Sequence, residues 1–153
     1  MSEVFAVSGG KNSGKTTLIE GLVAYFSSRG IKTAVIKHDG HGFEPDRDGT
    51  DSRRFYDAGA CGTAVFDGEK IQVVRRSREE IMPQRLFPEA DIILLEGFKY
   101  SGYPKIWMSS EEKFDNVENI MLRVGDGAKT VSEKDVKEAA ECILEYIRRR
   151  KNE

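Results

Sequence analysis

The feature that most constrains this chain is the sequence GGKNSGKT at residues 9–16. It matches G-x-x-x-x-G-K-[ST], the phosphate-binding loop or Walker A motif, whose glycines let backbone amides turn inward around phosphate oxygens. A short apolar run over residues 4–8 precedes it, and residues 16–29 follow with apolar side chains at helical spacing. A buried strand, a glycine-rich turn and an amphipathic helix in this order predict a parallel α/β fold.

The motif predicts nucleotide binding by its eight residues. The free N–H groups and the positive dipole end of the following helix attract phosphate. Lys15 supplies a charge for the β and γ phosphates, and the Thr16 hydroxyl suits Mg²⁺. Since the chain lacks the N/T-K-x-D motif that reads guanine, the residues alone leave the base open. We expect a nucleoside triphosphate with Mg²⁺ on Gly9, Gly10, Lys11, Asn12, Ser13, Gly14, Lys15 and Thr16.

Further apolar runs extend the fold. Residues 32–37 complete a β-α-β unit, and residues 91–96 predict a second strongly buried strand. Asp67-Gly68 between two β-rich runs predicts an antiparallel hairpin. Two weaker strands, at residues 105–108 and 120–124, come next, and the direction of the first is left open. A final amphipathic helix follows, and Ser132 with Asp135 three residues later predicts an N-terminal capping box at its start. We therefore predict one domain over residues 1–153, with a three-layer fold like that of phosphate-loop NTPases, a mostly parallel sheet and a hairpin extension.

A second acid commonly holds the metal in phosphate-loop proteins, and the run DIILLEG offers Asp91 and Glu96. Ligands of open α/β sheets bind beyond the carboxyl ends of the strands. Five residues at about 3.3 Å each place Asp91 roughly 16 Å from that end. Glu96 closes the strand, so we predict that Glu96 is the metal acid.

The polar segment 38–51 starts from the same sheet edge as the phosphate-binding loop. A segment of this length without apolar periodicity is often functional. It contains both histidines of the chain, and Asp39, nearest the strand end, is the candidate for a metal-water contact. Contact with the nucleotide, its Mg²⁺ or a second substrate is the favoured interpretation; a zinc site and a plain solvated loop are the alternatives. The candidate residues here are His38, Asp39, His41, Asp46, Asp48 and Asp51.

Composition excludes several classes of protein. With 24 basic and 26 acidic residues, the chain lacks the basic excess typical of proteins that bind nucleic acid through phosphates. No apolar run is long enough to span a membrane, and the N-terminus shows no signal-peptide pattern. Cys61 and Cys142 lie far apart without metal-ligand spacing. We expect a cytoplasmic protein with reduced thiols.

Several further motifs follow the phosphate-binding loop in a fixed order. After GGKNSGKT come Lys37-His38-x-x-His41, then Asp46-x-x-Gly49-x-Asp51-Ser52. Ala58-Gly59-Ala60, Leu95-Glu96-Gly97-Phe98-Lys99 and Pro104-Lys105-Ile106 follow. This order, which is far more specific than the phosphate-binding loop alone and covers about residues 4–108, resembles the molybdopterin-guanine dinucleotide biosynthesis adaptor (MobB) family. Where the family tends to show a basic residue after the last of these motifs, this chain has Met108-Ser109-Ser110.

The resemblance implies a homodimeric GTP-binding adaptor, joined through the hairpin region. It implies a role beside the guanylyltransferase that attaches GMP to molybdopterin, with molybdopterin itself as a further candidate ligand. Carried over by position, it extends the nucleotide-binding positions from Gly10 to Thr17 and places Glu96 near the metal. Asp46, Gly49, Asp51 and Ser52 match the family's second-loop motif, and Lys99 and Lys105 match its basic positions.

Two alternatives remain at this point, a small-molecule kinase and a metal-insertion GTPase of the phosphate-loop class. A kinase would use several arginines on the transferred phosphate, and a metal-insertion protein would need a histidine- or cysteine-rich segment. No arginine finger or water-orienting glutamine is identifiable in the candidate loops. We therefore expect at most a slow Mg²⁺-dependent GTPase.

Overall fold

The computed structural model describes residues 1–125, 127 and 130–153, and these form two compact units. The first unit combines Met1–His38 with Met82–Glu153, and the second is Asp39–Ile81. The prediction of one domain over residues 1–153 stays a prediction. Each unit is described by itself.

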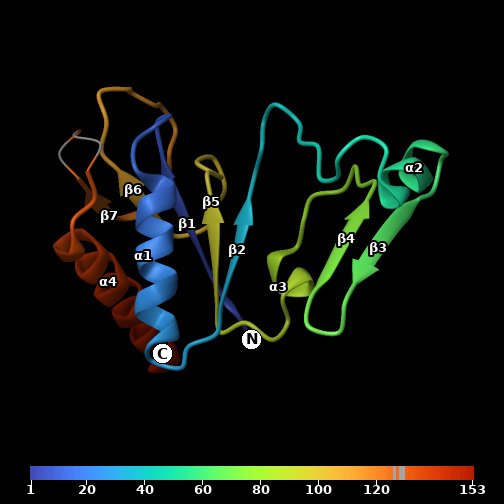
Figure 1. The fold of residues 1–153 in the computed structure, drawn as a ribbon. Coiled ribbons are helices and arrows are strands. Elements are labelled where there is room, and N and C mark those ends of the chain that lie inside the picture. Colours follow the sequence, from blue (N-terminus) through green and yellow to red (C-terminus); the bar gives the residue numbers. More distant parts are fainter. Residues whose placement is uncertain (126, 128–129) are drawn as a thin grey trace. The chain divides into compact units, whose positions relative to one another are not determined.

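The first unit contains a five-stranded sheet in the order β2-β5-β1-β6-β7 (Figure 1). All four neighbouring pairs are parallel. This confirms the predicted α/β fold with a mostly parallel sheet, and it settles the direction of β6. The strands are β1 (Glu3–Gly9), β2 (Thr33–Lys37), β5 (Ile92–Glu96), β6 (Lys105–Met108) and β7 (Ile120–Val124).

Helices α1 (Lys15–Ser27) and α4 (Glu133–Lys151) pack side by side on one face of this sheet (Figure 1). The rings of Phe5 on β1 and Tyr146 on α4 meet edge to face, with centroids 5.6 Å apart. The predicted Ser132–Asp135 capping box starts α4, since each residue accepts a hydrogen bond from the other's backbone N–H. In the described part of the chain, no helix is both long and apolar enough to cross a membrane.

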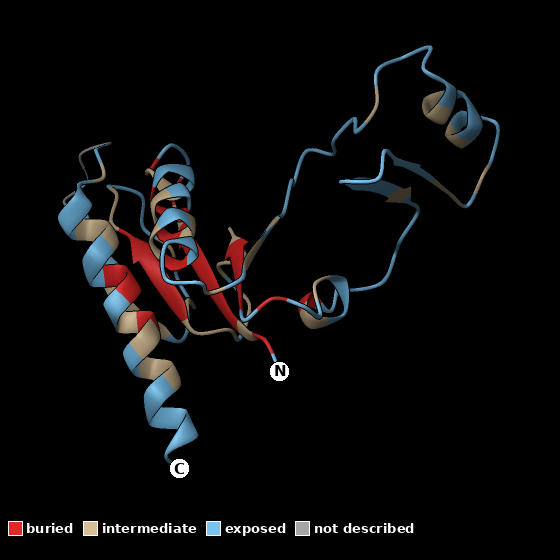
Figure 2. Ribbon diagram, turned by 60° about the horizontal axis from the view of Figure 1, so that its bottom comes forward, coloured by how far each residue is buried: buried red, intermediate tan, exposed pale blue. Residues whose placement is uncertain are grey.

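The other face of the sheet differs from the predicted three layers. Among the described residues no long helix covers it; the side chains of Phe87, Phe98 and Tyr103 pack there against Ala6 and Ile93. The reason is the short connection between β5 and β6, residues 97–104, which returns along the sheet without a helix. Eight extended residues span about 26 Å, which is enough to pass a five-residue strand. Most residues of β1, β5 and β6 are buried, and so are parts of α1 and α4 (Figure 2).

The second unit contains the predicted hairpin. Strands β3 (Gly62–Phe66) and β4 (Ile71–Arg75) pair antiparallel. The carboxylate of Asp67 accepts from the backbone N–H groups of Glu69 and Lys70, both at 3.0 Å, which fixes the turn. Helix α2 (Asp51–Asp57) begins after Thr50, whose hydroxyl accepts from the backbone N–H of Arg53. The short helix α3 (Pro83–Leu86) belongs to the first unit.

Close packing of α1 on α4 depends on Gly21. A Cβ atom at this position would lie 2.6 Å from Cγ2 of Val136, and a β-branched valine cannot turn away freely. We predict that Gly21→Ala lowers the free energy of unfolding by about 1–2 kcal/mol, because overpacking costs more than the helix propensity that alanine gains. Urea denaturation followed by circular dichroism measures this. The double variant with Val136→Ala should recover much of the loss; a Gly21→Ala protein as stable as the parent would contradict the proposed contact.

Candidate phosphate-binding site

The phosphate-binding loop forms at the carboxyl end of β1, between the sheet and α1. Asn12 and Gly14 adopt positive φ angles of 56° and 92°, and Ser13 Oγ donates to the carbonyl of Gly10 at 2.8 Å. Helix α1 begins at Lys15, and among the described residues no side chain hydrogen bonds its N-cap position. The first amides of α1 are therefore free to bind an anion, as phosphate recognition at a helix N-terminus requires.

The Lys15 ammonium stays within this loop. Its Nζ donates to the carbonyls of Gly10 and, at 3.3 Å, of Gly9. Burial lowers the pKa of Lys15, Glu96 and Glu112 oppose that effect, and Lys99 and Lys37 add to it. The lysine head therefore lies in the candidate ligand site, as the motif predicted.

Thr16 and Glu96 come together across the same sheet edge. The Thr16 hydroxyl donates to Glu96 Oε1 at 2.9 Å. Asp91 lies at the opposite end of β5, where its carboxylate accepts from the backbone N–H of Lys32 at 2.8 Å. Of the two acids in DIILLEG, Glu96 therefore contacts the Thr16 hydroxyl, which is the predicted ligand of Mg²⁺, and Asp91 does not.

A hollow of about 420 Å³ lies over this loop. Lys37, at the end of β2, lines this hollow together with residues that the motif predicted. Lys37 pairs with Glu96 in the parallel register of β2 and β5, so the two strand ends reach the same edge. Reasoning from sequence missed Lys37 as a site residue, although its place at a strand end could have indicated it. The hollow is lined by Lys11, Asn12, Ser13, Gly14, Lys15, Thr16, Thr17, Lys37 and Glu96.

The residues predicted from segment 38–51 divide between the units. His38 belongs to the first unit, where its ring packs on Phe98 with centroids 5.7 Å apart. In the second unit, Asp39 Oδ1 accepts from the backbone N–H of His41 at 3.0 Å, and Asp46 Oδ1 accepts from Gln72 Nε2 at 3.2 Å. Contact of these residues with a nucleotide or metal stays a prediction.

The remaining second-loop residues, Asp51 and Ser52, form the first turn of α2. The described residues contain no group of three or more His, Cys, Asp or Glu that could hold a metal ion, so the zinc alternative gains no support from the structure.

The two lysines after β5 have different surroundings. The Lys99 ammonium lies 3.9 Å from the ring centroid of Phe114, a cation–π contact. Lys105, the other basic position of the family motif, is fully buried. Its Nζ donates to the carbonyls of Ser101, Tyr103 and Glu118 at 2.6–2.9 Å, and burial lowers its pKa. Lys105 therefore links the segments before and after β6 through hydrogen bonds to their carbonyls. The motif alone could not show this structural role.

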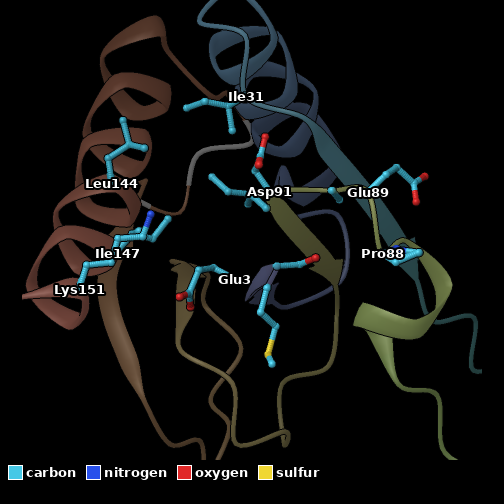
Figure 3. Close-up of a pocket in the computed structure, with 12 residues that line it drawn as sticks. Glu3, Ile31, Pro88, Glu89, Asp91, Leu144, Ile147 and Lys151 are labelled. Carbon is cyan, nitrogen blue, oxygen red and sulfur yellow. The ribbon is translucent and has the colours of Figure 1, made fainter.

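Another hollow, of about 580 Å³, lies at the amino edge of the sheet (Figure 3). Ile31, Leu144 and Ile147 form its apolar wall, and Glu3, Asp91 and Lys151 lie around it. The phosphate-binding loop is at the other edge, so this hollow is not part of the candidate site.

Comparison with known proteins agrees with this geometry. The family model described as molybdopterin guanine dinucleotide synthesis protein B matches residues 4–124. A Bacillus subtilis protein, described as a probable molybdopterin-guanine dinucleotide biosynthesis adapter protein, is 37% identical over 115 residues, which are 72% of this chain and 66% of the relative. The Haemophilus influenzae adapter protein of the same description is 31% identical over 114 residues, 71% of this chain and 64% of the relative.

The solved structures agree with the sequence relatives. The crystal structure of Bacillus subtilis MobB superposes with a TM-score of 0.70 at 30% identity, covering 94% of this chain and 96% of that one. The matches cover slightly less than two thirds of the length of the two sequence relatives. The family model accounts for most of the chain, including the phosphate-binding loop and Glu96. The chain belongs to the molybdopterin-guanine dinucleotide synthesis protein B (MobB) family.

Proposed function

We propose that this chain is a GTP-binding adaptor in the biosynthesis of molybdopterin guanine dinucleotide. The observation that carries the proposal is the phosphate-binding loop with its Thr16–Glu96 contact, in a chain of the MobB family. Relatives described as adapter proteins of this biosynthesis support it. The implied partner is the guanylyltransferase that attaches GMP, with molybdopterin as a further candidate ligand.

The residues present fit a Mg²⁺ ion beside the phosphates. Mg²⁺ prefers oxygen ligands and keeps several waters, so it is bound through few protein groups together with phosphate. The Thr16 hydroxyl and the Glu96 carboxylate offer such oxygens at the strand ends. Thr16 would bind the ion directly, and Glu96 would hold one of its waters.

Two arginines that a kinase could use are engaged within the second unit. Arg53 donates to the carboxylate of Asp57 at 3.0 Å and also pairs with Glu44. The Arg76 guanidinium stacks on Tyr56, 3.9 Å from the ring centroid. These contacts favour an adaptor over a small-molecule kinase. An adaptor also needs binding without rapid turnover, and phosphate-loop sites without an arginine finger hydrolyse as slowly as about 10⁻⁴ per second.

Binding of GTP is tested with Lys15→Ala. The loss of a charge-assisted contact with phosphate is expected to weaken GTP binding at least ~10-fold while the fold is retained, since the ammonium lies in the loop and not in the core. Titration calorimetry with GTP and ATP in the presence of Mg²⁺, together with circular dichroism, measures both effects. Unchanged affinity for GTP in a folded Lys15→Ala protein would overturn the proposal.

The metal role of Glu96 is tested by comparing Glu96→Gln with Asp91→Asn. Both changes remove one carboxylate, that of Glu96 at the last residue of β5 or that of Asp91 directly before its first residue, so they are a matched pair at opposite ends of the strand. We expect Glu96→Gln to weaken the Mg²⁺-dependent part of GTP binding about 10-fold, as loss of an outer-shell metal partner does. Asp91→Asn should leave it unchanged. GTP binding is measured with Mg²⁺ and with EDTA. If Asp91→Asn weakened the Mg²⁺-dependent part more than Glu96→Gln does, the assignment of Glu96 as the metal acid would be wrong.

We also propose that the chain forms a homodimer through the hairpin. Ala64, Phe66, Ile71 and Val73 are exposed and share one face, because directly paired residues of antiparallel strands point to the same side. An exposed apolar face beside free strand edges is typical of a surface that another chain covers.

The dimer is tested by two identical substitutions on opposite faces of the hairpin. Val73→Asp places a charge on the apolar face, and Val65→Asp places one on the other face, where the parent residue is also more than half exposed. We expect the parent and Val65→Asp to be dimers and Val73→Asp to be a monomer, because an unpaired buried carboxylate is costly. Light scattering after gel filtration at micromolar concentration reads the mass. A monomeric parent would contradict the proposal.

A further inference from the structure

A segment after β6 reaches the phosphate-binding loop from outside the motif. Glu112 Oε2 accepts a hydrogen bond from the backbone N–H of Lys11 at 3.2 Å. A Cβ atom on Gly10 would collide with the Glu112 carboxylate and would lie 2.9 Å from Ser110 Oγ. Two side chains of one segment thus lie directly against the loop that the motif assigns to phosphate.

The residues on both sides of Glu112 make contacts with the rest of the first unit. The backbone N–H of Ser109 donates to the carbonyl of Val124 at 2.8 Å. The ring of Phe114 meets that of the buried Trp107 edge to face, with centroids 5.7 Å apart, and it also carries the Lys99 ammonium on its face. These contacts on both sides favour a defined position for the Glu112 carboxylate.

The Glu112 carboxylate has the chemistry of the expected ligand. It is an anion that accepts from a backbone amide of the phosphate-binding loop, which is the contact that a phosphate oxygen makes there. It also lies near enough to Lys15 to raise the pKa of that lysine. A phosphate group and the Glu112 carboxylate would compete for the Lys11 amide.

Ser110 supplies an independent observation. Its Oγ is buried, and among the side-chain atoms of the described residues it is the one buried oxygen or nitrogen without a hydrogen-bond partner. Buried hydroxyls are nearly always paired, so an unpaired one beside a binding loop indicates a missing partner. An oxygen of a bound phosphate would supply that partner.

We propose that the side chains of Ser110 and Glu112 form a further wall of the phosphate site, in which Glu112 holds the place of a phosphate until a nucleotide displaces it and Ser110 then donates to the bound phosphate. The inference rests on the proposed nucleotide binding. Its consequence is that only the fraction of molecules with Glu112 displaced can bind, so the apparent dissociation constant is the intrinsic one divided by that fraction.

The place-holding role is tested by Glu112→Gln, with Glu111→Gln as the control that removes the neighbouring charge. Glutamine keeps the shape of the side chain and removes its negative charge, so the loop is vacated more often. We expect Glu112→Gln to bind Mg²⁺-GTP and inorganic triphosphate about 3- to 10-fold more tightly than the parent, with the gain in the association rate. Glu111→Gln should bind like the parent. Affinity equal to that of Glu111→Gln, or weaker binding, would overturn the place-holding role.

The role of Ser110 is tested by Ser110→Ala beside Ser109→Ala. If Ser110 donates to a bound phosphate, its loss weakens binding of both probes about 3- to 10-fold through a faster dissociation rate, and Ser109→Ala leaves binding unchanged. Equal affinities of the two alanine variants would overturn the Ser110 contact.

Inorganic triphosphate separates contacts with phosphate from contacts with the base. Lys15→Ala separates this inference from the proposed function. If the parent binds GTP and Lys15→Ala does not, while Glu112→Gln behaves as the parent, the proposed function stands and the inference fails. If the parent and Lys15→Ala bind GTP equally, the proposed function fails first.

Discussion

The parallel pairing of β1 with β5 is the constraint on which the candidate site depends. It places Val7, near the end of β1, opposite Glu96, so that the phosphate-binding loop and the acid leave the sheet at the same edge. The pairing continues beyond the strand, where the backbone N–H of Gly97 donates to the carbonyl of Val7 at 3.0 Å. A shift of this register by one residue would turn Glu96 to the other face of the sheet. The Thr16–Glu96 contact therefore depends on the apolar side chains that fix the register on both faces of these strands.

The parts of the structure that follow from local sequence were predictable. The motif GGKNSGKT predicts the loop because its glycines allow the backbone to turn and its lysine supplies a charge within the loop. The length of β5 was sufficient to predict that Glu96, and not Asp91, lies at the carboxyl end of the strand. Asp67-Gly68 identified the hairpin, and Ser132 with Asp135 identified the start of α4. In each of these cases the residues that decide the structure lie within a few positions of one another.

The parts that depend on distant contacts were not predictable in the same way. The direction of β6 is decided by its pairing with β1, and the missing third layer is decided by how the connection 97–104 returns along the sheet. The sequence alone does not indicate that Lys105 is buried. Its ammonium is surrounded by the carbonyls of Ser101, Tyr103 and Glu118, and these come together only in the folded chain. Burial of a lysine is costly, and these three acceptors offset the loss of water. Glu112 lies 101 positions from Lys11 in the chain, and no local pattern connects them.

The same physics explains how a phosphate-binding loop remains formed before a ligand arrives. Amides and a lysine that converge on one point repel one another and are left without hydrogen-bond acceptors. In this structure the Lys15 ammonium turns to the carbonyls of Gly9 and Gly10, and the Lys11 amide finds the Glu112 carboxylate. These contacts keep the donors satisfied, and the proposed phosphate would have to replace them. The affinity that we propose for the site is therefore the difference between two sets of contacts, and it would depend on these internal acceptors as much as on those of the nucleotide.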